Sequence, residues 1–221
     1  MFFAFFVLTV VLSVFRLYII LPGSRKRSSH VVRTPRTYTI AVYLGSGGHT
    51  SEAVTLMSSL DPNKCNRRIY VINDGDDLSL RKALELETKV AKQEKSSYSI
   101  LSIPRARRVH QSLITTPLAA LYSLMVCSYH LTLLPLFSHG HRTFADILIL
   151  NGPGTCFILC IAVYINKFFG FHAPYIVFVE TFARVNSLSL SGKLVRPFAD
   201  RFVTQWPDIQ AVQERSKHWL V

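Results

Sequence analysis

The first feature of this sequence that could do chemistry is a glycine-rich segment: Gly45, Ser46, Gly47, Gly48, His49 and Thr50. An apolar run precedes it, and a run with helical spacing follows it. Glycines let a backbone turn sharply and approach a ligand closely. The free N–H groups and the dipole at the start of a helix favour an anion, usually a phosphate. The segment therefore predicts a phosphate site, with tight packing between strand and helix as the alternative.

This loop differs from two common nucleotide-binding motifs. It lacks the Gly-Lys-Ser/Thr run of a P-loop, and Thr50 stands at the third glycine position of the dinucleotide fingerprint. His49 lies within the loop, where an imidazole can act as a general base toward a hydroxyl or contact a phosphate. His49 is therefore our candidate catalytic residue, and a structural loop histidine is the alternative.

A second glycine-rich turn, the segment 151–155 (NGPGT), also follows an apolar run and precedes a helical pattern. Two such helix starts would converge on one anionic group if their strands are neighbours, and the simplest such group is a diphosphate. Two unrelated structural turns are the alternative explanation. The candidate diphosphate-binding residues are the following members of both turns: Gly45, Ser46, Gly47, Gly48, Thr50, Asn151, Gly152, Gly154 and Thr155.

Charged residues near the expected rim of the sheet are candidates for contacts with substrate or a partner. Glu180 ends a later apolar run. A carboxylate there could also serve a helix start or pair with Arg184. Arg105, Arg107 and Arg108 form a basic cluster that predicts contact with lipid headgroups or phosphate. A merely solvated basic face is the alternative for this cluster.

Short apolar runs alternate with segments of helical spacing along most of the chain. The runs predict strands over 37–44, 68–73, 98–103, 145–150, 174–179 and 201–205. The helical segments predict helices over 51–60, 78–93, 112–137, 155–169 and 209–220. Nearly continuous apolar strands indicate a parallel sheet that is covered on both faces.

This alternation predicts an α/β fold with a single Rossmann-like, doubly wound parallel sheet. In the strand order 3-2-1-4-5, strands one and four are neighbours, and ligands bind in the crevice above their carboxyl ends. The two glycine-rich turns follow these two strands, so we expect them to face each other across that crevice. The helix over 112–137 is apolar enough to lie in the membrane interface as well as on the sheet.

The amino-terminal segment predicts a membrane anchor. Residues 1–21 are almost entirely apolar and long enough to span a bilayer, with Arg16 as their only charge. The basic residues that follow predict that the remainder of the chain stays in the cytosol. We therefore expect a transmembrane signal anchor over 1–21, a basic juxtamembrane linker over 22–36 and a cytosolic domain over 37–221. A cleaved signal peptide and a surface-lying helix are the alternatives.

Composition excludes several classes of protein. The chain has 221 residues, 49% of them hydrophobic, which argues against disorder. Its four cysteines are too sparse for a disulfide scaffold, so we expect reduced, buried thiols. The net charge of +12 lies mostly beside the apolar amino terminus and in one loop, without any nucleic-acid-binding motif. We therefore expect no nucleic-acid partner.

Three segments together resemble the membrane-anchoring subunit of the eukaryotic UDP-N-acetylglucosamine transferase of the dolichol pathway. They are GSGGHTSE, ILNGPGTC and VETFARVNSLSLSGKLVRPFADRFVTQWP. The family is similar to the amino-terminal half of MurG, a bacterial lipid-linked glycosyltransferase of GT-B architecture. The resemblance covers nearly the whole chain. It implies half of a GT-B enzyme, whose donor-binding half is a separate polypeptide.

The resemblance also implies an activity and a location. The subunit would recruit a small soluble catalytic partner that binds UDP-GlcNAc, as a heterodimer at the cytosolic face of the endoplasmic reticulum membrane and also at the nuclear envelope. The pair would add a second GlcNAc, in β1,4 linkage, to dolichyl-diphosphate-GlcNAc. His49 matches the loop histidine of the bacterial family. The chain alone is expected to be inactive.

Two other functions remain open at the level of sequence. One is a membrane-anchored enzyme that binds a nucleotide cofactor of the NAD type, in which Asp74 after the second strand would contact a ribose. The other is a purely structural recruiter with a degenerate crevice. We expect no cofactor. We also expect no metal, because no Asp-x-Asp run is placed to hold one, and Asp74 with Asp76 is the nearest candidate.

Overall fold

The structure is a computed structural model that describes residues 2–22, 37–61, 64–91, 97–107, 111–112, 114–137 and 143–206. Six parallel strands form one sheet in the order β3-β2-β1-β4-β5-β6. The strands are β1 (Tyr38–Leu44), β2 (Cys65–Asn73), β3 (Ser97–Ile103), β4 (Ile147–Asn151), β5 (Tyr175–Val179) and β6 (Arg201–Val203). The predicted α/β fold and the order of its first five strands are confirmed, and the sixth strand lies beside β5.

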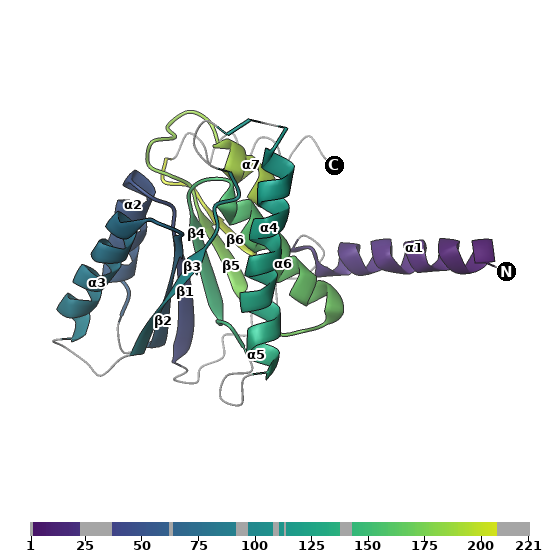
Figure 1. Ribbon diagram of the computed structural model, residues 1–221, viewed down its shortest axis with the longest axis horizontal. Coiled ribbons are helices and arrows are strands. Elements are labelled where there is room, and N and C mark those ends of the chain that lie inside the picture. The colour runs from purple at the N-terminus through teal and green to yellow at the C-terminus, as the bar shows by residue number, and fades with distance from the viewer. Residues whose placement is uncertain are drawn as a thin grey trace.

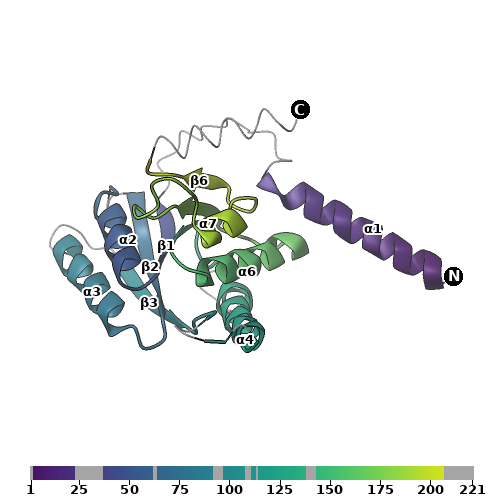
Figure 2. The same ribbon diagram turned by 90° about the horizontal axis from the view of Figure 1, so that it is seen from above.

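Helices cover both faces of this sheet (Figures 1 and 2). One face carries α2 (Gly48–Ser58) and α3 (Asp77–Ala91). The other carries α4 (Thr116–Ser128), the π-helical turn η3 (Tyr129–Leu133), α5 (Leu134–Phe137) and α6 (Thr155–Phe169). The short helix α7 (Leu190–Val195) precedes β6.

Alternation of side chains along the strands builds two separate cores. Ala41 and Tyr43 of β1 belong to one buried cluster, which includes Leu159 of α6. Val42 belongs to the other, which includes Met57 of α2. Successive strand residues point to opposite faces, so a strand that is covered on both sides must be apolar throughout. This is why the strands read as continuous apolar runs in the sequence.

The described elements differ from the predicted ones chiefly in two places. The helix expected over 112–137 begins at Thr116, and the π turn over Tyr129–Leu133 interrupts it. The helix α7 was not predicted, because six residues are too few for a periodic signal. The helix expected over 209–220 lies outside the described residues, as do Arg108 and all but residue 22 of the linker.

Buried contacts hold the π turn in place. Asn166 of α6 donates from Nδ2 to the carbonyl oxygen of Leu131 at 3.0 Å, and its Oδ1 accepts from Thr132 Oγ1 at 2.5 Å. The residue four positions after Leu131 is Pro135, which has no N–H to donate to the Leu131 carbonyl. A side chain from the neighbouring helix therefore supplies a hydrogen bond to a carbonyl that lacks its usual partner.

The helix α1 (Phe2–Ile20) extends from the domain as a separate rod (Figure 1). It and the helical stretch Thr116–Phe137 are both long and apolar enough to cross a membrane. The guanidinium of Arg16, the only charged residue of 1–21, donates to the carbonyls of Lys167 and Phe168, both at 3.0 Å. Arg16 thus bonds to the carboxyl end of α6, where helix carbonyls lack intrahelical partners and favour a cation.

All four cysteines are free and buried, as the sequence predicted. Burial raises the pKa of the Cys127 and Cys160 thiols to about 12. Cys156 and Cys65 also have a raised pKa, chiefly because they are buried. These thiols are therefore protonated and unreactive near neutral pH.

Candidate functional site

The two glycine-rich turns meet at the carboxyl ends of β1 and β4. Leu44 pairs with Asn151 in the register of the two strands, so both turns leave the sheet side by side. A Cβ atom at Gly45 would lie 2.8 Å from Pro153 Cδ and 2.9 Å from the carbonyl oxygen of Asn151. Gly152 has a φ of +133° and would place a Cβ 3.3 Å from the Cα of Gly45. The predicted neighbourhood of the turns is confirmed, and glycine is needed at both positions.

Each turn opens a helix, as the sequence predicted. Gly47, with a φ of 57°, is the N-cap of α2, and Gly154 is the N-cap of α6. The first amides of a helix have no intrahelical acceptor and carry the positive end of its dipole. Gly47 and Gly48 are exposed, so the first amides of α2 are open to a ligand.

A chain of hydrogen bonds orients His49. Asn151 donates from Nδ2 to Glu52 Oε2 at 2.8 Å, and Asn151 Oδ1 lies 3.0 Å from His49 Nδ1. A carboxylate only accepts, so Glu52 turns the Asn151 carbonyl oxygen toward the imidazole. His49 Nδ1 therefore carries the hydrogen, which leaves Nε2 of the neutral ring as a free base. This tautomer is inferred from the hydrogen-bond network.

Glu52 also ties the first turn to the end of β5. Its Oε1 accepts from Thr181 Oγ1 at 2.8 Å and from the Phe182 amide at 3.2 Å. Sequence reasoning did not identify Glu52. Its position one helical turn after His49 was the available signal, but its partners lie about a hundred residues away in the chain.

A cavity of about 770 Å³ opens beside the two turns. Its polar end is formed by Gly45, Ser46, His49, Pro153, Gly154, Thr155, Arg105 and Arg107. Its apolar wall is formed by Ala120 of α4, Phe157 and Ile158 of α6, and Leu190 and Leu194 of α7. The cavity therefore joins an anion cradle to a surface that suits a hydrocarbon chain.

Polar residues at the ends of β1 and β2 position the first turn. Ser46, whose φ is 69°, donates its hydroxyl hydrogen to Asp76. The Ser46 oxygen also accepts from Asn73 Nδ2 at 3.2 Å and from Arg105 Nη2 at 3.3 Å. Tyr43 donates to Asn73 Oδ1 at 2.9 Å. Tyr43, Asn73 and Asp76 were not predicted to be part of the site, although the strand order places the ends of β1 and β2 there.

Charge at this end of the cavity is set by Asp76 and Arg105. Burial opposes ionisation of Asp76, but hydrogen bonds from Ser46 and Ser79, together with nearby Arg105, lower its pKa below the usual value. The Arg105 guanidinium lies 4.0 Å from the Asp76 carboxylate and remains one-third exposed. Burial raises the pKa of Tyr43 far above its usual value, so its phenol stays neutral.

Not every predicted site residue faces the cavity. The Thr50 hydroxyl is buried 2.6 Å from Ser79 Oγ, between α2 and α3. Thr155 lines the cavity, but its Oγ1 also accepts from the Ala106 amide at 3.2 Å. Arg107 also lines the cavity, but its side chain is exposed and donates to the carbonyl oxygen of Gln111 at 3.1 Å.

Glu180 is buried and holds the loop before α7. Its Oε1 accepts from the Thr181 amide at 3.2 Å, and its Oε2 accepts from the Ser189 amide at 3.1 Å. Ser189 in turn caps α7 by accepting from Gly192 N at 2.9 Å. Within the described part of the chain, this carboxylate is bound by backbone amides rather than by Arg184, which is exposed on the same loop.

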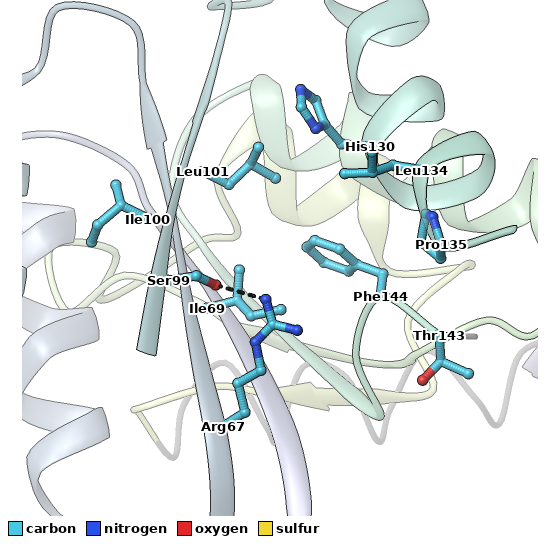
Figure 3. A pocket seen from close by; sticks show the side chains of 10 residues that line it. All are labelled: Arg67, Ile69, Ser99, Ile100, Leu101, His130, Leu134, Pro135, Thr143 and Phe144. Carbon is cyan, nitrogen blue, oxygen red and sulfur yellow. Dashed lines mark hydrogen bonds between the residues drawn. The ribbon is translucent and has the colours of Figure 1, made fainter. Parts of the chain in front are cut away.

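Two further cavities are present among the described residues, and the larger of them includes Asn151 of the second turn. One of about 400 Å³ lies between β2, β3 and the η3–α5 segment, with Arg67, His130 and Phe144 among its lining residues (Figure 3). Arg67 donates there to Ser99 Oγ at 3.2 Å. The other, of about 890 Å³, lies over β4, β5 and β6 on the face that also carries α2. Neither contains residues from both helix starts.

Comparisons with known proteins agree with this arrangement. The chain matches the family model described as "Oligosaccharide biosynthesis protein Alg14 like" over residues 40–221. A protein of Cryptococcus neoformans named UDP-N-acetylglucosamine transferase subunit ALG14 is 44% identical over 207 residues, which cover 93% of this chain and 88% of the relative. Proteins with the same name from Schizosaccharomyces pombe and Homo sapiens are 38% and 36% identical.

The coverage of these two relatives is also broad. The alignment with the Schizosaccharomyces pombe protein covers 96% of both chains. The alignment with the human protein covers 83% of this chain and 82% of the relative. The matched region includes all six strands except the first two residues of β1, and therefore both glycine-rich turns and the cavity. The chain belongs to the Alg14-like family of oligosaccharide biosynthesis proteins.

Proposed function

We propose that this chain is the membrane-anchored, acceptor-side subunit of a UDP-N-acetylglucosamine transferase in N-glycan precursor synthesis. The names of its relatives describe subunits of a UDP-N-acetylglucosamine transferase. The single observation that carries the proposal is the cavity that joins two helix starts to an apolar wall. A diphosphate bound to a lipid has this combination of an anionic group and a hydrocarbon chain.

The acceptor in this proposal is dolichyl-diphosphate-GlcNAc. Its diphosphate would lie at the first turns of α2 and α6, near Ser46, Gly154 and Arg105. Its hydrocarbon chain would lie along Ala120 and Leu194. The nucleotide sugar UDP-GlcNAc would be bound by a separate soluble subunit, because the described chain forms one sheet with one such crevice. The pair would work on the cytosolic face of the endoplasmic reticulum membrane.

His49 is the proposed base of the reaction. Its Nε2 takes the proton from the 4-hydroxyl of the acceptor GlcNAc while that oxygen attacks C1 of UDP-GlcNAc. The bond between C1 and the UDP oxygen breaks on the opposite side, and UDP leaves with the electron pair. The configuration at C1 inverts, which gives a β1,4 linkage. The hydrogen bond from His49 Nδ1 to Asn151 stabilises the imidazolium that forms.

The nucleotide-cofactor alternative finds no support in the family or in the names of the relatives. The Asp74 carboxylate, which would have contacted a ribose, is exposed and accepts from Ser102 Oγ at 2.5 Å. Thr50, at the third glycine position, packs against α3. These contacts favour the transferase subunit.

Reconstitution in vesicles tests the proposal. We expect no GlcNAc transfer to the lipid acceptor from the full-length chain alone, and transfer once the soluble partner is added. In the complex, His49→Gln should lower the rate by about 10²–10⁴-fold, the usual contribution of a general base. The exposed Lys89→Ala on α3 is the matched control. Partner binding, followed by co-purification, should be the same in both variants.

Two outcomes would contradict parts of this proposal. Transfer by the chain alone would show that the donor site is not on a separate subunit. Full activity of the His49→Gln complex would remove the base from the mechanism. If glycine substitutions in both turns also left transfer unchanged while the partner still bound, the chain would be a structural recruiter.

A further inference from the structure

The helical stretch from α4 to α5 presents a long apolar surface that no described part of the chain covers. Its exposed side chains, which we call the α4 face, are between 46% and 80% exposed. They are Leu118, Leu121, Tyr122, Met125, Tyr129, Leu133, Leu136 and Phe137. They recur at helical spacing, opposite the buried side that contains Ser123, Cys127 and Leu131.

Charge distinguishes this face from the surface of a water-exposed helix. The stretch Thr116–Phe137 contains no Asp, Glu, Lys or Arg. By contrast, α3 on the other side of the sheet exposes Arg81, Glu85 and Lys89. A helix of a soluble domain normally carries charged residues on its outer face. The α4 face is therefore better suited to an apolar environment than to water.

The position of α1 relates this face to a bilayer. In both views α1 leaves the domain on the side of the sheet that carries α4 and α6, and α4 runs across the direction of α1 (Figures 1 and 2). If α1 spans the bilayer, α4 lies along the plane of its surface. An amphipathic helix that binds a membrane interface adopts this orientation.

Contacts between α1 and α6 fix this geometry. Arg16 donates two hydrogen bonds to the carboxyl end of α6, and Ile20 is buried in the adjoining core. Next to that end of α6, Phe169 and Phe171 are 65% and 44% exposed. Aromatic side chains are enriched at the boundary between bilayer and water. The carboxyl end of α1, the carboxyl end of α6 and the α4 face would thus lie at the same depth, near the bilayer surface.

We propose that the α4 face rests in the interfacial layer of the bilayer that α1 spans, as a second membrane contact. Arg105 and Arg107 precede α4, and the chain carries a net charge of +12, so anionic lipids would strengthen this contact. The α4 face is not a second span, because its opposite side packs on α6 and contributes to the core.

The membrane contact would also give lipids a route to the cavity, an inference that rests on the proposed function. Thr116 and Ala120 of α4 line the cavity next to Leu190 and Leu194. A lipid chain can therefore pass sideways from the bilayer into the cavity, along α4, without crossing water. The membrane contact itself does not depend on which lipid is glycosylated.

Spin-label depth measurements on the full chain test the contact. Leu121→Cys and Met125→Cys place a nitroxide on the α4 face, and Glu85→Cys places one on α3 as the matched control. The native thiols are buried with raised pKa values, so an exposed introduced cysteine reacts selectively. The labelled chains are reconstituted into vesicles of phosphatidylcholine and phosphatidylserine, and collisions with oxygen and with a water-soluble nickel chelate are compared.

Labels at 121 and 125 should collide several-fold more often with oxygen, which concentrates in lipid, than with the nickel chelate. The label at 85 should show the reverse. The proposal is overturned if the labels at 121 and 125 are as accessible to the chelate as the label at 85. It is also overturned if they become shielded only when a soluble partner protein is added, because the face would then be a protein interface. Neither result would bear on GlcNAc transfer.

Discussion

At the scale of single residues, the site depends on how closely two backbones approach each other. Gly45 and Gly152 touch across the carboxyl ends of β1 and β4, and His49 lies against both. This close approach brings Asn151 within hydrogen-bonding distance of His49. The hydrogen-bond chain that begins at Glu52 then leaves His49 Nε2 free to accept a proton. A shift of either turn would therefore disturb both the proposed base and the proposed diphosphate site.

Alanine substitutions at Gly45 and Gly48 test whether close packing makes glycine necessary in the first turn. Gly45→Ala should lower the free energy of unfolding by about 1–3 kcal/mol, because its Cβ would overlap Pro153 and the Asn151 carbonyl. Gly48→Ala is the matched control, since a Cβ there meets nothing within 4 Å. It should leave stability unchanged or raise it by up to about 1 kcal/mol. Urea unfolding in detergent micelles measures both, and equal stability of the two variants would contradict the close contact.

At the scale of elements, a π turn joins α4 to α5 and determines how both lie on α6. Asn166 fixes that turn through Leu131 and Thr132. The turn allows Tyr129 and Leu133 to remain on the exposed face while Leu131 stays in the core. The continuity of the α4 face therefore depends on one buried amide of the neighbouring helix.

Removing that amide should destabilise the domain. Asn166→Leu leaves the Leu131 carbonyl unpaired, which should lower the free energy of unfolding by about 1–3 kcal/mol. Ser128→Ala is a control in the same stretch, because the buried Ser128 Oγ has no hydrogen-bond partner among the described residues. Its loss should be neutral or stabilising. Chemical unfolding of the full chain checks both, and a loss at Ser128 as large as that at Asn166 would refute this account.

At the scale of the whole molecule, the domain is oriented relative to α1. Arg16 is the polar part of this connection and Ile20 the apolar part. Because α1 meets α6, and α6 begins at the second glycine-rich turn, one helix links α1 to the candidate site. If α1 spans the bilayer as proposed, this link places the cavity at a defined height above it.

Loss of the Arg16 contact should loosen this orientation. In Arg16→Ala the distance between spin labels at Leu12→Cys and Glu85→Cys should spread over a wider distribution, while the chain stays in the membrane. Thr9→Ala is the control, because Thr9 Oγ1 donates within α1, to the Phe5 carbonyl at 2.9 Å. Pulsed electron resonance measures the distribution. An unchanged width in Arg16→Ala would show that Ile20 alone sets the orientation.

The sequence determined the topology, because its signals are local. Alternating apolar runs and helical spacings gave six parallel strands, and the strand order followed from general rules for doubly wound sheets. The two glycine-rich turns could be found for the same reason, since each lies between a strand and a helix. The apolar helix α1 was recognisable from length and composition alone.

Only the tertiary structure decided which side chains meet at the site, because those contacts join residues far apart in the chain. In the folded chain, the buried Glu180 carboxylate accepts from backbone amides. Glu52 accepts hydrogen bonds from Asn151 and from the loop after β5. It also decided that the apolar stretch after Arg107 buries one side on α6 and exposes the other. Periodicity shows that a helix has an apolar side, but which neighbour covers that side depends on packing of the whole chain.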